Sequence, residues 1–345
     1  MTADAITTGL GTFSREKFKA LVSVRHRALS SLRRFFYSQG YIEVTTSSLV
    51  NIAGSCENPY ASFTLPYYGR EAHLSQSAQL QLETLVGRLG MRVFTVNNSF
   101  REESYEDPEA YGRRLSEFTL LEPEAPYNPN LGPEEALKEL RHLVELTIKS
   151  AVRCVLQCCE SEIAFLGGDV DYLKRSAEQR FQVLTYEEAL SILNKLPEQQ
   201  NKLQFGDDLG IGEERNLLRY FENCPTFVTM YPSSIKFFNM KRTEDERMVY
   251  SLDLLTPSLG ETVGGAVREV DGDKVVDYLR HSRVGEILRK EGKDPTLPFT
   301  EYLALFEEGN MCPRFGFGIG FERLVGFLLQ SNDILHTVAY RTLSP

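Results

Sequence analysis

Two apolar runs with a short turn between them constrain the fold of this 345-residue chain more than any other feature. Residues 249–255 and 261–268 are separated by Thr-Pro-Ser-Leu-Gly, which is a typical turn sequence. Strands joined this closely pair antiparallel, because a parallel pair needs a crossover of a dozen or more residues. The sequence therefore predicts an antiparallel sheet that contains this hairpin.

Helical patterns alternate with further strand-like runs. Residues 14–39 form an amphipathic pattern that ends at Gly40, and further helices are expected over 76–89, 133–160 and 321–330. One face of the first helix carries the apolar side chains Phe18, Leu21, Val22, Leu29, Leu32 and Phe36. Strand-like runs are expected at 41–46, 91–100, 117–123 and 314–320.

The whole pattern predicts an α+β fold in which helices flank an antiparallel β-sheet. No internal repeat, low-complexity tract or linker divides the sequence, so a single domain over 14–345 with a tail at 1–13 is expected.

Composition limits the functions to be considered. Lys and Arg total 38 against 48 Asp and Glu, and a net charge of −10 opposes binding to a nucleic-acid backbone unless the basic residues cluster. The N-terminus resembles no signal peptide and no run approaches the ~20 apolar residues of a membrane span, so we expect a cytoplasmic protein without a membrane partner. Six cysteines without CxxC spacing indicate free, mostly buried thiols.

Charged residues in three strand contexts are candidates for chemistry. Arg101 and Glu103 lie two apart and so share one face of a strand. A guanidinium suits a phosphate or carboxylate, and a carboxylate beside it could accept a hydrogen bond from an exocyclic amine. A solvated edge strand explains this pair equally well.

The other two contexts are the hairpin and the glycine-rich run near the C-terminus. The hairpin would bring Asp253 and Glu261 together, and two adjacent carboxylates favour a Mg²⁺ ion that carries nucleotide phosphates. Glycines at 316, 318 and 320 permit close backbone approach, and Arg323 follows where a helix begins, a position that favours an anion. Each context taken alone could also be structural.

In this order the three segments resemble motif 2, the metal-binding strands and motif 3 of class II aminoacyl-tRNA synthetases. They read FREE at 100–103, DLLTPSLGETVGGAVR at 253–268 and GFGIGFER at 316–323. Within the asparaginyl and aspartyl group, the asparaginyl members are the most similar, especially in LSQSAQLQLETL (74–85), SEFTLLEPEAP (116–126), FGDDLG (205–210) and GFGIGFERLV (316–325). The resemblance runs from about residue 14 to residue 340, and it implies the class II catalytic fold.

The resemblance also implies a role for each motif residue. Arg101 would hold the α-phosphate of ATP and the substrate carboxylate, and Arg323 would hold the γ-phosphate. The residues implied for the remaining contacts are Glu103 and Phe118 for adenine, Arg113 and Arg114 for the nucleotide, Asp253 and Glu261 for Mg²⁺, and Glu57, Gln79, Glu83 and Arg268 for the amino acid. The implied reaction joins a carboxylate to AMP and releases pyrophosphate, with catalysis by positioning and charge neutralisation.

Several positions depart from the family pattern. Only about 13 residues precede the first helix, so the anticodon-binding OB-fold is expected to be absent. The acidic loop 104–112 is enlarged where the family meets tRNA, although a solvated surface insertion is an alternative. Ser47 replaces a proline of motif 1, through which a homodimer is implied. Arg114 and Arg314 replace histidines, and Ala266 replaces a serine.

Leu82 stands where aspartyl relatives have lysine, and Glu83 follows as in the asparaginyl pattern. Glu83 could accept a hydrogen bond from a substrate amide whose oxygen takes one from Arg268. An exposed, structural Glu83 is the alternative.

The leading functional expectation from the sequence is an AMP-forming ligase related to asparagine synthetase. It would adenylate aspartate, asparagine or a close analogue and pass the acyl group to ammonia or a small amine, with tRNA an unlikely partner. One alternative is a truncated synthetase that aminoacylates tRNA or a carrier. Another is a catalytically silent regulator that binds an amino acid or an adenylate.

Overall fold

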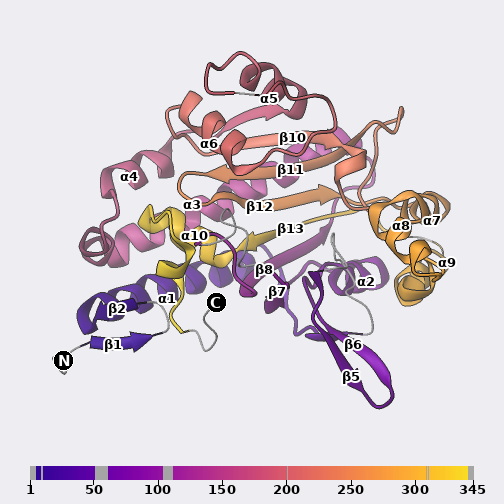
Figure 1. The fold of residues 1–345 in the computed structure, drawn as a ribbon, viewed down its shortest axis with the longest axis horizontal. Coiled ribbons are helices and arrows are strands. Elements are labelled where there is room, and N and C mark those ends of the chain that lie inside the picture. The colour runs from indigo at the N-terminus through magenta and orange to yellow at the C-terminus, as the bar shows by residue number, and fades with distance from the viewer. Residues whose placement is uncertain are drawn as a thin grey trace.

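The computed structural model describes residues 5–8, 11–50, 61–103, 112–199, 201–307, 309 and 311–340. Its centre is an eight-stranded sheet in the order β3-β7-β8-β13-β12-β11-β10-β9 (Figure 1). Neighbouring strands pair antiparallel except at the two edges, where β3 with β7 and β9 with β10 are parallel. The strands are β3 (Ile42–Glu43), β7 (Val93–Phe100), β8 (Glu117–Pro126), β9 (Gln182–Thr185), β10 (Thr226–Pro232), β11 (Met248–Thr256), β12 (Gly260–Val267) and β13 (Arg314–Gly320).

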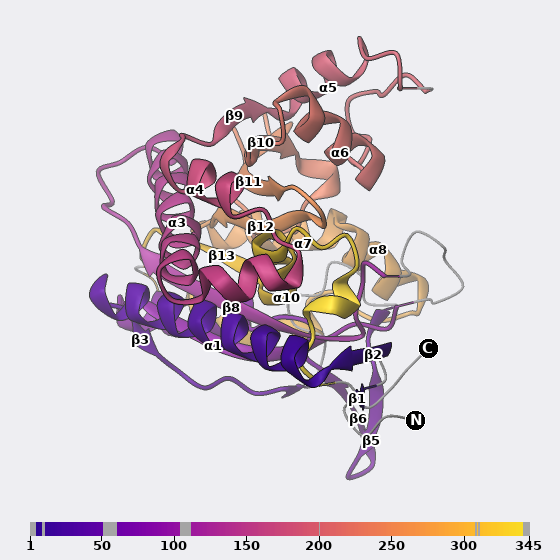
Figure 2. The same ribbon diagram turned by 90° about the vertical axis from the view of Figure 1, so that its left-hand side faces the viewer.

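Three helices cover one face of this sheet. The long helices α1 (Arg15–Ser38) and α3 (Pro133–Leu166) lie side by side, with α10 (Phe321–Leu329) beside them (Figure 2). Ser14 caps α1 by accepting a hydrogen bond from the Lys17 amide, which satisfies one of the unpaired donors of the first turn. Leu21, Val144 and Phe227 belong to the main core between these helices and the sheet. These helices cover this face of the sheet, which we call the closed face.

A second core lies against the opposite face. Phe227 belongs to the first core and Val228 to the second, because successive side chains of a strand point to opposite faces. Helices around this second face leave its centre open. They are α2 (Gln79–Leu89), α5 (Tyr186–Leu193), α6 (Ile211–Tyr220), α7 (Gly272–His281), α8 (Arg283–Lys290) and α9 (Thr300–Glu307).

Smaller elements complete the described part of the chain. The helix α4 (Val170–Glu178) packs against α3, and a three-stranded sheet of β4 (Leu49–Val50), β5 (Thr64–Tyr67) and β6 (Arg70–Leu74) projects from the body (Figure 1). In the segment expected to be a tail, β1 (Ala5–Thr8) and β2 (Gly11–Ser14) pair antiparallel. Within the described residues, no helix is long and apolar enough to cross a membrane.

The expected α+β architecture is confirmed, and the expected hairpin is the antiparallel pair β11 and β12. The run 41–46 yields only the two-residue strand β3, and α3 continues six residues beyond its expected end, to the left-handed Gly167. Val22 is 42% exposed although it was expected on the buried face of α1. The five described cysteines are free, as expected, but only Cys159 and Cys224 are buried; Cys56 lies outside the described residues.

Candidate active site

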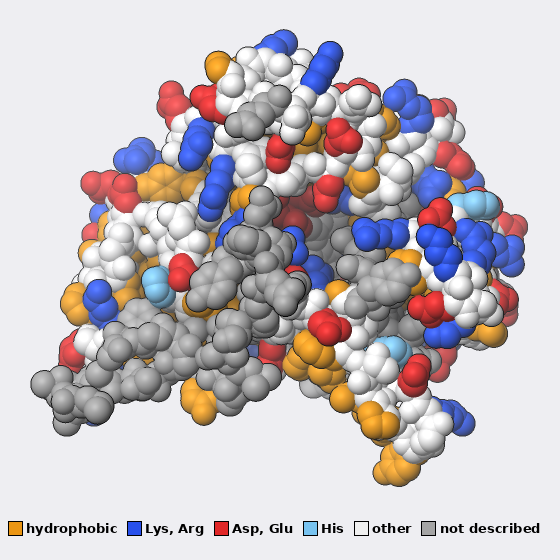
Figure 3. All heavy atoms as spheres, viewed as in Figure 1, with side chains coloured by type: hydrophobic (Ala, Val, Ile, Leu, Met, Phe, Trp, Pro, Cys, Tyr) orange, Lys and Arg blue, Asp and Glu red, His pale blue; other side chains and the backbone are white. Residues whose placement is uncertain are grey.

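A cavity of about 350 Å³ opens on the second face of the sheet. Its floor is formed by β8, β11, β12 and β13, and its sides come from α2, α6 and the segment before α6. Figure 3 shows this face hollowed near its centre, where acidic and basic side chains gather. Glu122 and Glu124 both line the floor because they lie two apart on β8. The cavity brings together residues from two of the three segments that the sequence singled out, the hairpin and the glycine-rich run that leads to Arg323.

The hairpin carboxylates Asp253 and Glu261 both face the space above Gly264. A Cβ atom on Gly264 would lie 3.0 Å from Glu261 Oε1 and 3.5 Å from Asp253 Oδ1, so the glycine keeps that space open. Lys236 Nζ donates to Asp253 Oδ2 at 2.7 Å. Burial raises the pKa of Asp253 to about 6 against the opposing effect of Lys236.

This pair fits a small divalent cation. Among the described residues no group of three or more His, Cys, Asp or Glu side chains could hold a metal ion. A cation here would therefore take one or two carboxylates and complete its shell with water or phosphate oxygens. That is the usual coordination of Mg²⁺ beside a nucleotide.

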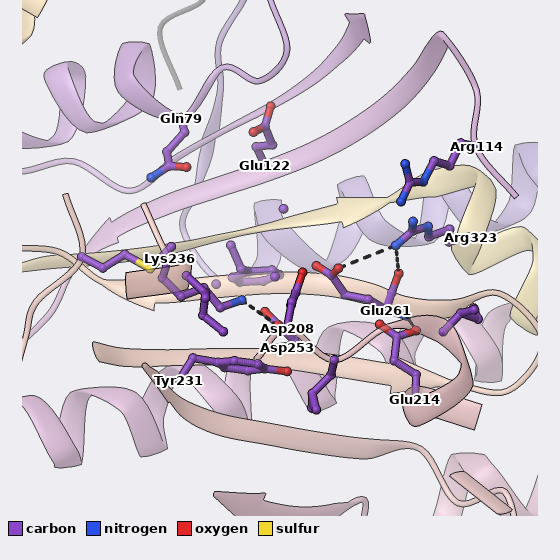
Figure 4. Close-up of a pocket in the computed structure, with 18 of the residues that line it drawn as sticks. Gln79, Arg114, Glu122, Asp208, Glu214, Tyr231, Lys236, Asp253, Glu261 and Arg323 are labelled. Atoms are coloured by element: carbon purple, nitrogen blue, oxygen red, sulfur yellow. Dashed lines mark hydrogen bonds and ion pairs between the residues drawn. The ribbon is translucent and has the colours of Figure 1, made fainter. Parts of the chain in front are cut away.

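Arginines lie at the same end of the cavity. Arg323, in the first turn of α10, donates to the Glu261 carbonyl oxygen, and its Nη1 is 3.8 Å from Glu261 Oε2 (Figure 4). Arg114 lies near Arg323, and its side chain is 54% exposed. Burial, with the nearby Arg215 charge, lowers the pKa of Arg113 to about 10. Cationic groups around a space next to two carboxylates suit a metal-bound polyphosphate.

Glu214 is an acid at this end that the sequence interpretation missed. Its Oε2 accepts from the Glu261 amide at 3.2 Å, and burial followed by the nearby Glu261 charge raises the pKa of Glu214 to about 8. It comes from α6, which is remote in sequence from the hairpin, so no local pattern could have indicated it.

The residues implied to bind the α-phosphate and the adenine of ATP lie beside the cavity rather than among its lining side chains. Arg101 follows β7, and its guanidinium is 5.9 Å from the ring centre of Phe118 on the neighbouring strand β8. Arg101 Nε is buried and has no hydrogen-bond partner within the described residues. Glu103 pairs with Arg114 at 3.2 Å, which connects this group to the cavity wall.

The other end of the cavity contains Gln79 and Arg268. Arg268 donates to Glu124 through Nε at 3.1 Å and Nη2 at 3.0 Å. Burial raises the pKa of Glu124 to about 7, and Arg268 opposes that rise. Burial alone would lower the pKa of Arg268, but the Glu124 and Glu83 charges outweigh it and raise the pKa.

Glu83 lies behind this end. Its side chain is 0% exposed, so the alternative of an exposed helix residue is wrong. Gln79 Nε2 donates to Glu83 Oε1 at 3.1 Å, and Arg268 Nε is 3.4 Å from the same oxygen. Glu57, the remaining residue implied for the pocket, lies outside the described residues.

Other polar residues of the cavity had no role assigned from the sequence, among them Lys236, Glu122 and Glu124. Lys236 pairs with Asp253, while Glu124 pairs with Arg268. Glu122 accepts from the Ala78 amide at 2.9 Å and from the Ser77 hydroxyl, and burial raises its pKa. The two glutamates belong to a strand-like run, where carboxylates on the inward face were the available signal. Lys236 has no comparable local signal.

Comparison with known proteins gives one consistent family. The family described as tRNA synthetases class II (D, K and N) matches residues 8–343. The asparagine–tRNA ligase of Bacteroides fragilis (strain YCH46) is 29% identical over 94% of this chain and 70% of its own. That of Pyrococcus abyssi is 34% identical over 92% of this chain and 67% of its own.

A solved structure agrees with these matches. Asparaginyl-tRNA synthetase from Pyrococcus horikoshii complexed with asparaginyl-adenylate has a TM-score of 0.80 and 33% identity, over 94% of this chain and 68% of that one. The expected class II catalytic fold is thereby confirmed.

Two expectations about the acceptor do not survive this comparison. The expectation that tRNA is an unlikely partner is wrong, because the relatives found are named asparagine–tRNA ligases. The asparagine synthetase-like transfer to ammonia or a small amine gains no support from them. The net charge of −10 misled here because it is a sum over the whole surface, whereas binding depends on the charge of a local region.

Proposed function

Because the chain belongs to the class II tRNA synthetases of the D, K and N group, we propose that it activates an amino acid of the asparagine–aspartate type with ATP and transfers it to tRNA. One observation carries this proposal. A single cavity holds a carboxylate pair and arginines at one end and a buried, acid-paired arginine at the other. These ends suit a metal-bound triphosphate and a small polar side chain, respectively.

At the nucleotide end, Asp253 and Glu261 would hold Mg²⁺. The ion would neutralise phosphate charge and keep the leaving pyrophosphate in place. Arg323, with Arg113 and Arg114 nearby, would bind the outer phosphates. Arg101 would bind the α-phosphate, and Phe118 and Glu103 would position the adenine. Lys236 holds Asp253 by an ion pair and so fixes that carboxylate before the metal arrives.

Activation then requires no covalent bond to the protein. The substrate's α-carboxylate oxygen attacks the α-phosphorus of ATP, and the bond from that phosphorus to the bridging oxygen breaks. Pyrophosphate leaves and an acyl-adenylate remains. The Arg101 guanidinium, which lies beside the Phe118 ring, would stabilise the negative charge that develops at the α-phosphate in the transition state.

At the amino-acid end, the Glu122 carboxylate lines the cavity on the same side as Gln79 (Figure 4). We assign it to the substrate ammonium group. Arg268 would donate to the end of the substrate side chain. A terminal ribose hydroxyl of tRNA would then attack the acyl carbon, so that an ester forms and AMP leaves.

Amino-acid-dependent ATP–pyrophosphate exchange tests the first half of this proposal, and charging of unfractionated tRNA tests the second. We expect exchange with aspartate or asparagine that requires Mg²⁺ and is lost in Asp253→Asn. Exchange without charging would restrict the function to adenylation. Ligand binding without any exchange would contradict the proposal and favour the silent regulator.

A further inference from the structure

The buried carboxylate of Glu83 is fully occupied by donors of the protein itself. Oε2 accepts from the Tyr302 hydroxyl at 2.8 Å and from Arg314 Nη2 at 2.7 Å. Oε1 accepts from Gln79 Nε2 at 3.1 Å and from the Asn239 side-chain amide. Each carboxylate oxygen offers about two lone-pair positions, so these four donors use them all. A substrate amide could bind Glu83 only by displacing one of them.

Arg314 is the charged member of this set. It is the first residue of β13, its side chain is 0% exposed, and its Nε and Nη1 have no hydrogen-bond partner within the described residues. A guanidinium held this deeply stays only if a carboxylate compensates it. Arg314 and Glu83 therefore form a pair in which neither charge can be removed without exposing the other to an apolar interior.

Arg268 lines the cavity and is hydrogen-bonded to Glu124 through two of its three nitrogens. These are Nε and Nη2, whereas Nη1 has no partner within the described part of the chain. Glu124 packs directly against the backbone of Gly316 on β13, since a Cβ atom on that glycine would lie only 1.6 Å from Glu124 Oε2. This end of the cavity thus presents a guanidinium donor, with Glu83 already engaged behind it.

The charges around the side-chain subsite are balanced before a substrate arrives, and Glu122 remains for the substrate ammonium group. Arg268 and Arg314 offset Glu83 and Glu124. Without the Arg314 charge the cluster would be net negative and would repel an anionic side chain. With it, a carboxylate on Arg268 Nη1 would form an ion pair as well as a hydrogen bond, whereas an amide oxygen would form the hydrogen bond alone.

We infer that Arg314 is a positioning residue that sets substrate choice through Glu83, so that the side-chain subsite prefers a carboxylate, as in aspartate, to an amide. The inference rests on the proposed function only for the identity of the site as an amino-acid pocket. The raised pKa of Glu124, about 7, agrees with it, since that acid can take up a proton when an anion binds nearby.

The test is calorimetric binding of L-aspartate and L-asparagine to the full chain and to three variants. Wild type should bind aspartate more tightly, by about tenfold. Arg314→Gln removes the charge and should lower the aspartate-to-asparagine affinity ratio by about tenfold or more. Glu83→Gln should move the ratio the opposite way, and Arg314→Lys should retain the wild-type preference. Opposite changes of this affinity ratio in Arg314→Gln and Glu83→Gln indicate an effect on specificity, because a purely structural defect would weaken the binding of both ligands to the same extent.

Tighter asparagine binding by wild type overturns the inference, as does an equal change for both ligands in Arg314→Gln and Glu83→Gln, or failure of both ligands to bind. If Arg314→Gln does not fold by circular dichroism, the ratio in Glu83→Gln decides. Pyrophosphate exchange is measured on the same samples. If the affinities follow the expected pattern but no pyrophosphate exchange is seen, the inference is supported and the proposed function is overturned. If exchange is seen but the aspartate-to-asparagine affinity ratio is the same in the variants as in wild type, the proposed function is supported and the inference is overturned.

Discussion

Buried carboxylates of the site, among them Asp253, Glu124 and Glu214, have raised pKa values for one physical reason. Burial penalises their charged form, and the pKa is about 6 for Asp253, about 7 for Glu124 and about 8 for Glu214. The largest effect of a neighbour opposes this rise at Asp253, where it comes from Lys236, and at Glu124, where it comes from Arg268. At Glu214 the largest effect of a neighbour comes from Glu261 and adds to the rise. Among these three residues, deprotonation of Glu214 therefore has the largest free-energy cost.

The substitution Glu214→Gln should make the free energy of unfolding fall less as pH rises. An acid with a raised folded-state pKa holds more protons when folded, so its contribution to stability is complete below its unfolded pKa and is lost as pH rises through the folded value. For Glu214 the window runs from about pH 4.5 to about pH 8. Between pH 6 and 9, without metal, we expect wild type to lose on the order of 2 kcal/mol more than the variant. Denaturant unfolding at several pH values measures this, and equal slopes would contradict it.

Arg323→Ala should reduce pyrophosphate exchange by at least about a hundredfold, because the phosphate end loses a fixed cation. The fold should remain, since the side chain is 30% exposed and its protein contacts described above are confined to Glu261. Exchange kinetics and circular dichroism check both statements. An exposed arginine of the closed face, Arg27→Ala, is the control and should keep wild-type exchange. Near-normal activity of Arg323→Ala would mean that the phosphates bind elsewhere.

At the scale of the element, the β11–β12 hairpin was predictable and its consequences were partly so. A five-residue turn signal between apolar runs identified both strands and brought Asp253 and Glu261 to one place. Lys236 and Glu214 were not predictable, because they reach the hairpin from segments that pair with it only in the folded chain. Glu83 was recognised as a pocket residue, but its Arg314 partner is 231 positions away, and no local pattern encodes such a contact.

Gly264→Ala tests the hairpin as a metal-holding element. The added methyl group would enter the space between Asp253 and Glu261, so the Mg²⁺ concentration for half-maximal exchange should rise about tenfold. Gly212→Ala is the matched control, because a Cβ there meets no atom within 4 Å. Titration of exchange with Mg²⁺ measures both variants. The same shift in both, or in neither, would argue against a cation between the two carboxylates.

At the scale of the whole molecule, the sheet separates a closed, helix-covered face from an open, charged one. The fold class was predicted correctly from the sequence, because it depends on the periodicity of apolar residues along the chain. The expectation about tRNA was wrong, because the net charge of a chain does not show how charge is distributed over its surface. Arg113, Arg114 and Arg323 gather at one end of the cavity although acids outnumber bases overall.

The two steps of the proposed reaction should depend differently on salt concentration. tRNA charging should fall steeply between about 50 and 200 mM salt, because release of counterions from the tRNA phosphates drives part of the binding. Pyrophosphate exchange uses contacts inside a cavity, which are screened less, so it should change by about twofold at most. Parallel assays on one preparation measure both. Equal salt dependence would argue against a phosphate-backbone contact.

The strands that form the cavity floor have one further consequence. β8, β13, β12 and β11 are each hydrogen-bonded on both sides, so their backbones have no free edge along which to shift. Their amides should exchange with deuterium only when the whole domain opens. A backbone held in this way allows single side chains to be replaced while the backbone atoms of the site keep their positions. A lineage carrying it can acquire new substrates by point mutation without having to rebuild the fold.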